Sequence, residues 1–138
     1  MELQKGDLDL DALVNLETMF MEYGYEDGMK AGELSGALEG RVLGCEKAFE
    51  ISRELGYYYG CASTWIMLFQ KSPDKFSDRL LKQAQSLQTL IDEIPMENQV
   101  NTEILLLVER VRAKFKVLTS ILGVSQKYNA MDKPAMAY

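Results

Sequence analysis

Residues 24–60, GYEDGMKAGELSGALEGRVLGCEKAFEISRELGYYYG, are the stretch that decides the fold. Eight of the chain's ten glycines lie here, and the spacing between successive glycines is always four residues or a multiple of four. Ala48 and Ser52 occupy the two register positions that interrupt the glycines, and both are also small. The small positions are therefore Gly24, Gly28, Gly32, Gly36, Gly40, Gly44, Ala48, Ser52, Gly56 and Gly60, which we call the glycine ridge.

Three structures could produce this spacing. A flexible linker has no fixed period and few apolar residues, whereas Leu34, Leu38 and Phe49 lie between the small positions. A phosphate-binding loop needs glycines at one turn between a strand and a helix, and no strand precedes this stretch. A long helix that carries a ridge of small residues fits the spacing best.

Such a helix needs compensation. A glycine in a helix interior costs about 1 kcal/mol relative to alanine, so eight cost roughly 8 kcal/mol, which is comparable to the stability of a small domain. A ridge without side chains lets a second backbone approach closely, as in small-xxx-small helix packing. Charged residues such as Lys30, Arg41 and Glu46 exclude a lipid setting. We therefore expect the ridge to bind another helix.

The geometry of the ridge favours a second chain as its partner. Four residues advance about 400° around a helix, so the ridge drifts by about 40° at each step. A neighbouring helix must cross steeply or wind around it with right-handed sense. A continuous helix over residues 24–70 would be about 70 Å long, and the helices expected later are about half that length. The ridge is thus predicted to pair with a helix of another subunit.

The other elements are also predicted to be helical, which makes the chain all-α. The expected single domain over residues 1–124 contains an amphipathic helix over 9–23, the repeat helix over 24–71, and an antiparallel hairpin over 73–94 and 102–122. Its apolar stripes are Leu13, Leu16, Phe20 and Tyr23; Phe76, Leu80, Ala84, Leu87, Ile91 and Ile94; and Ile104, Val108, Val111, Phe115, Leu118 and Leu122. Trp65 is expected to pack the end of the repeat helix against the hairpin, and residues 125–138 to form a mobile tail.

Composition excludes several classes of function. The 138 residues carry a net charge of −6, which argues against nucleic acid or an anionic membrane as a partner. There is no histidine, so the usual catalytic triads are absent. The sequence therefore predicts no enzyme and no bound cofactor or metal. The N-terminus lacks the pattern of a secretory signal, so we expect a cytoplasmic protein, with the nucleus as a second compartment.

A few residues leave alternatives open. Cys45 and Cys61 are interpreted as small core residues, and a cluster shared between two chains is the alternative. Tyr57, Tyr58 and Tyr59 are consecutive and point in different directions, which predicts no stacking platform. The basic band Arg110, Arg112, Lys114 and Lys116 indicates either a solvated face or a surface for an acidic partner.

The ten-position repeat resembles the deca-glycine repeat of the Yae–Lto adaptor family, and its surroundings resemble the Lto subunit, also called the oral-cancer-overexpressed protein family. The lead-in FMEYGYEDG (20–28), the segment GCASTW (60–65) and the segment RAKFK (112–116) are similar to the family's. The resemblance implies a non-catalytic adaptor that pairs with a Yae-type subunit through the glycine ridge. It also implies that the pair links an ABC-type iron–sulfur ATPase, which recycles ribosomes, to the cytosolic iron–sulfur assembly targeting complex.

The resemblance also extends to the end of the chain. In several family members a terminal aromatic residue docks on the targeting complex after an apolar and an acidic residue. This chain ends in Met136, Ala137 and Tyr138, so the apolar and aromatic positions are filled and alanine replaces the acid. We expect Met136 and Tyr138 to dock there. The rival hypothesis for the whole protein is a structural helical subunit of another, ribosome-associated complex.

Overall fold

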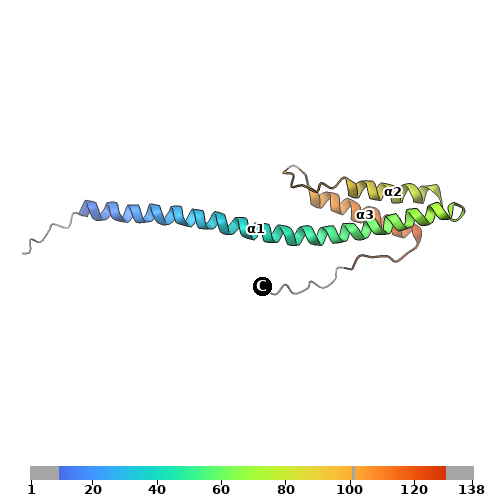
Figure 1. Ribbon diagram of the computed structural model, residues 1–138, viewed down its shortest axis with the longest axis horizontal. Helices are drawn as coiled ribbons and strands as arrows, with labels where there is room; N and C mark the ends of the chain where they lie inside the picture. The colour runs from blue at the N-terminus through green and yellow to red at the C-terminus, as the bar shows by residue number, and fades with distance from the viewer. Residues whose placement is uncertain (1–9, 101, 130–138) are drawn as a thin grey trace, which may run out of the picture. The chain divides into compact units, whose positions relative to one another are not determined.

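The computed structural model describes residues 10–100 and 102–129, and throughout these ranges the protein is all-α, as predicted. The elements are α1 (Leu10–Lys71), the short 3-10 helix η1 (Pro73–Lys75), α2 (Asp78–Asp92) and α3 (Ile104–Leu122) (Figure 1). No strand occurs in the described ranges.

Helix α1 is a single helix of 62 residues. It contains residues 10–23 of the helix expected over 9–23 and the whole repeat helix expected over 24–71, without a break at Gly24. The glycines of the ridge keep helical backbone angles, because Gly123 is the only glycine with a positive φ among the described residues. The ridge is therefore built on regular helix.

The chain divides into two compact units, residues 1–46 and 47–138. In the first unit the described residues all belong to α1, and residues 11–45 are exposed. The second unit holds the rest of α1, together with η1, α2 and α3. The single domain over residues 1–124 stays a prediction.

The hydrophobic core lies in the second unit, where α1, α2 and α3 pack together. Its members are Leu55, Tyr58, Ala62 and Phe69 from α1, Ala84 and Leu87 from α2, and Val108, Val111, Phe115 and Leu118 from α3. The residues from α1 recur at intervals that suit one helix face, and Ile51 and Trp65 complete that face at the edge of the core. Trp65 thus packs against the hairpin region, as the sequence predicts.

Turn residues set the limits of the later helices. Pro73 begins η1, where its missing amide hydrogen costs nothing, and α2 ends at Asp92, shortly before Pro95. Helix α3 ends at Gly123, whose φ of 69° places it in the left-handed region. Helices α2 and α3 lie side by side in Figure 1. They occupy most of the ranges 73–94 and 102–122 expected for the hairpin.

Candidate partner-binding surface

In the first unit the glycine ridge is open to the approach of another backbone. A methyl group built at Gly24, Gly28, Gly32, Gly36, Gly40 or Gly44 would meet nothing within 4 Å. All six of these glycines are exposed. No contact among the described residues therefore explains why these positions are glycine.

Apolar side chains border this part of the ridge. A groove is lined by Gly24, Gly28 and Gly32 together with Tyr25, Met29 and Glu33. The side chains of Tyr25 and Met29 remain 70% and 60% exposed. Large apolar side chains beside an uncovered backbone are typical of a surface that is buried in an assembly.

In the second unit the ridge continues through Ala48, Ser52, Gly56 and Gly60, which are all exposed. Nothing lies within 4 Å of a methyl group built at Gly56 or Gly60. The core of this unit instead uses another face of α1, which carries Leu55, Tyr58 and Ala62. Within the second unit, helices α2 and α3 thus leave this part of the ridge uncovered, and its binding of a second chain stays a prediction.

An aromatic cluster lies near the end of the ridge. The centroid of the Phe115 ring lies 4.4 Å from that of Tyr58 and 5.7 Å from that of Trp65, and the Phe115 and Trp65 rings are stacked. Tyr57 lies 6.0 Å from Phe115 and 5.5 Å from Tyr128. The sequence predicts no stacking platform from the three consecutive tyrosines, and that stays a prediction. Tyr57 and Tyr58 both contact Phe115 of the neighbouring helix α3 with tilted rings.

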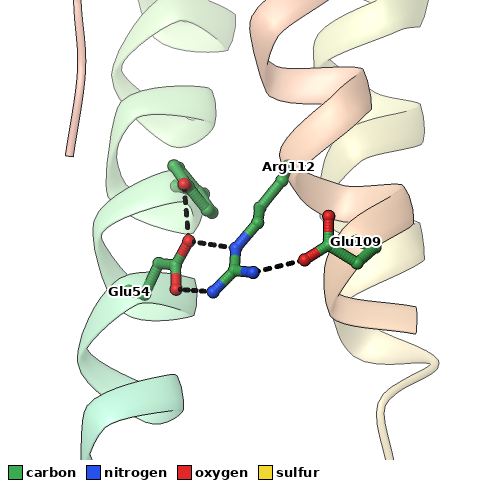
Figure 2. A network of polar contacts seen from close by, with 4 residues as sticks. Glu54, Glu109 and Arg112 are labelled. Atoms are coloured by element: carbon green, nitrogen blue, oxygen red, sulfur yellow. Dashed lines mark hydrogen bonds and ion pairs between the residues drawn. The ribbon is translucent and has the colours of Figure 1, made fainter. Parts of the chain in front are cut away.

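A polar network joins α1 to α3 within the second unit (Figure 2). Arg112 donates from Nε to Oε1 of Glu54 at 2.7 Å and from a terminal nitrogen to Oε2 at 2.7 Å. Arg112 also donates to Glu109, and the Tyr58 hydroxyl donates to Oε1 of Glu54 at 2.7 Å. Glu54 is only 8% exposed, so its carboxylate depends on these partners.

The network fixes the charge state of its members. The hydrogen bond from Arg112 lowers the pKa of Glu54, and it outweighs the opposing effect of burial. The same hydrogen bond raises the pKa of Arg112, while burial and the bond to Glu54 raise the pKa of Tyr58. The network therefore holds a carboxylate, a guanidinium and a neutral phenol, which suits a clamp between helices.

Two comparisons with known proteins bear on the ridge. Residues 24–62 match the family described as "Essential protein Yae1, N terminal", from the first glycine of the ridge to just beyond the last. The chain is also similar to "Protein LTO1 homolog" of Mus musculus, with 28% identity over 118 residues that cover 86% of each chain. Both findings show that the chain is similar to Yae1-type and LTO1-type proteins. No solved structure matches the chain.

The segment that matches the Yae1 family, residues 24–62, lies entirely within α1. The mouse relative matches over a longer range, which is consistent with a similarity that includes the later helices. Met136 and Tyr138, the expected docking residues for the targeting complex, lie outside the described residues. Their role stays a prediction.

The two cysteines differ in burial, and the basic band is partly used for contacts within the chain. Cys61 is half-buried and packs against the core, but Cys45 is exposed, so its interpretation as a core residue is wrong. Burial raises the pKa of Cys61, which favours the thiol. In the basic band, Arg112 binds Glu54 and Lys114 donates to Ser86. Half of this band is thus used inside the chain.

Residues 10–100 and 102–129 contain no group of three or more cysteine, aspartate or glutamate residues that could hold a metal ion. None of the helices in these ranges is both long enough and apolar enough to cross a bilayer.

Proposed function

We propose that this protein is a non-catalytic adaptor subunit that forms a heterodimer with a Yae-type subunit through the glycine ridge. The pair would link an ABC-type, ribosome-recycling iron–sulfur ATPase to the cytosolic iron–sulfur assembly targeting complex. The observation that carries the proposal is the bare ridge within the segment that matches the Yae1 family.

The energetics of the first unit support a partner. Six glycines between residues 24 and 44 cost about 6 kcal/mol of helix stability relative to alanine. The described residues of this unit form no core that could offset that cost, since residues 11–45 are all exposed. Burial against a second helix supplies the missing stabilisation, because most helical stability in proteins comes from packing.

The chemistry of the surface fits a helix as the occupant. Close approach of two backbones requires small residues at each turn, and the ridge supplies ten of them. Exposed apolar side chains beside the ridge, such as Tyr25, Met29 and Leu43, can then be buried by the same partner. A Yae-type subunit with a similar repeat offers the matching surface.

The client and the targeting complex enter through the family resemblance. An adaptor needs a second surface besides the ridge, and we propose that Met136 and Tyr138 provide it for the targeting complex. An aromatic ring next to a small apolar segment can enter a pocket on a partner protein. This role places the protein in the cytoplasm, with the nucleus as a second compartment.

Bulk on the ridge is the direct test of the proposal. The paired substitution Gly36→Leu and Gly40→Leu raises helix propensity but blocks close approach, so we expect it to abolish capture of a co-expressed Yae-type subunit. The matched control, Gly36→Ala with Gly40→Ala, adds a single methyl group at each position and should retain capture. Equal capture by the leucine and alanine variants would contradict the ridge interface.

Co-purification from cytosol tests the adaptor role separately. The wild-type protein should bring down the Yae-type subunit, the ABC-type ATPase and the targeting complex, identified by mass spectrometry. Recovery of the Yae-type subunit alone would instead favour the rival hypothesis of a structural subunit without a role in cluster delivery.

A further inference from the structure

The residues that follow α3 return to α1 instead of leaving the protein. Gly123 ends α3 in the left-handed conformation, and the Val124 amide donates to the Thr119 carbonyl at 3.1 Å. We call residues 124–129 the C-terminal strap. These residues belong to the tail that was expected to be mobile, yet they contact α1 within the second unit.

Two interactions with Tyr57 hold the strap. The Tyr57 hydroxyl donates a hydrogen bond to the carbonyl oxygen of Lys127 at 3.2 Å. The ring of Tyr128 packs 5.5 Å from Tyr57 and 6.3 Å from Tyr58, between centroids. Tyr128 is half-buried, whereas the other strap residues are exposed. So small a set of contacts can open without unfolding the core.

The strap also borders the end of the glycine ridge. One groove on α1 is lined by Gly56, Gly60 and Trp65 together with Gln126 of the strap. The strap does not fill this groove, because Gly56 and Gly60 remain exposed with nothing within 4 Å of a built methyl group. The strap borders one side of this groove, while Gly56 and Gly60 at its base remain exposed.

We propose that the C-terminal strap is a clasp that the partner subunit holds closed. A partner helix that lies on Gly56 and Gly60 contacts Gln126 from the open side and presses the strap against Tyr57. This inference rests on the proposed pairing through the ridge. It adds a consequence, namely that pairing fixes the course of the chain beyond α3.

Limited trypsin digestion of the full chain tests the clasp. The bond between Lys127 and Tyr128 is a trypsin site, and its carbonyl oxygen accepts the hydrogen bond from Tyr57. The one later lysine, Lys133, precedes Pro134 and is not cut, so loss of residues 128–138 reports cleavage at Lys127 alone. In the unpaired protein, Tyr57→Phe and Tyr128→Ala should speed this cleavage about three- to tenfold, the change expected from losing one ordinary interaction.

The control is Tyr59→Phe, which makes the same chemical change at an exposed tyrosine of the same helix and should leave the cleavage rate unchanged. Co-expression with the Yae-type subunit should slow cleavage of the wild-type chain relative to the unpaired chain. The Gln126→Ala variant should be protected less by the same subunit. Wild-type rates in both the Tyr57 and the Tyr128 variants would overturn the strap itself.

The partner's effect separates the two proposals. A Yae-type subunit that binds without slowing cleavage, or that speeds it, overturns the clasp and leaves pairing intact. Capture that is equal for the leucine and alanine ridge variants overturns pairing through the ridge, and the clasp fails with it.

Discussion

Glu54 of α1 and Arg112 of α3 form a two-pronged ion pair, with both nitrogen–oxygen distances at 2.7 Å. The carboxylate is nearly buried, while the Arg112 side chain is 44% exposed. The pair therefore differs from an exposed surface ion pair, because the Glu54 carboxylate has little contact with solvent. It ties the ridge-bearing helix to the hairpin region within the second unit.

Removal of Arg112 should destabilise the protein. Arg112→Ala leaves the Glu54 carboxylate buried without its main donor, which should lower the free energy of unfolding by about 1–3 kcal/mol. Urea denaturation measures this value. Arg110→Ala, an exposed arginine on the same helix, is the control and should stay within about 0.5 kcal/mol of wild type. Similar losses for both variants would show that the ion pair is not responsible.

The ion pair between Glu54 and Arg112 should make the free energy of unfolding depend on pH in the acidic range. Because the folded-state pKa of Glu54 lies below its ordinary value of 4.5, its contribution is fully present above that pH and is lost as the pH falls through the folded pKa. Urea denaturation at pH 7, 5 and 3 should show that the free energy of unfolding falls less with decreasing pH for Glu54→Gln than for wild type. Parallel pH profiles would contradict an ionised Glu54 in the clamp.

Truncation of Phe115 should damage the core of the second unit. Phe115 contacts Tyr57, Tyr58 and Trp65, so Phe115→Ala should cost about 3–5 kcal/mol. Trp65 is the only tryptophan, and its fluorescence can follow unfolding. Val117→Ala, an exposed site on α3, should leave the unfolding midpoint and the emission nearly unchanged.

A side chain at position 123 should strain the end of α3. Gly123→Ala must adopt a φ of 69°, which costs about 1 kcal/mol for a residue with a Cβ. Gly123→Asn should cost less, because asparagine tolerates this conformation better. Thermal unfolding by circular dichroism measures both. An alanine variant as stable as wild type would argue against the left-handed end of α3.

Hydrogen exchange should distinguish the two units. Amides of residues 11–45 should exchange rapidly in the unpaired protein, since that stretch of helix is exposed and rich in glycine. Amides near Leu87 and Val111, both fully buried, should exchange slowly. Addition of a Yae-type subunit should protect the first group. Equal protection of both groups without a partner would contradict the energetic argument for pairing.

Much of the fold can be predicted from periodicity. The stripe from Ile104 to Leu122 is predicted from its alternating spacing, and its four central members are buried. Ala84 and Leu87 of the preceding stripe are buried as well. These stripes can be recognised from their regular intervals of three and four residues, although exposed apolar residues such as Leu105, Val117 and Ile121 lie between the members on α3.

Other features are hidden by overlapping patterns. Ile51, Leu55, Tyr58, Ala62, Trp65 and Phe69 follow intervals of four and three and pack in or against the core, but the glycine register in the same residues obscures them. Glu54 lies next to this apolar face and is buried. A carboxylate at the edge of an apolar face is a sequence signal for a buried, positively charged partner. The pairing of Glu54 with Arg112 depends on the alignment of α1 with α3, which local sequence does not specify.

The uniformity of the ridge has a consequence for recognition. A helix that slides along α1 by four residues, about 6 Å, meets glycine where it met glycine before. The small positions therefore permit contact without choosing among alignments. The alignment of a partner helix would therefore be determined by the positions where the repeat is irregular, such as Ala48 and Ser52. Bulky side chains next to the ridge, such as Tyr25 and Tyr57, would contribute to the same selection.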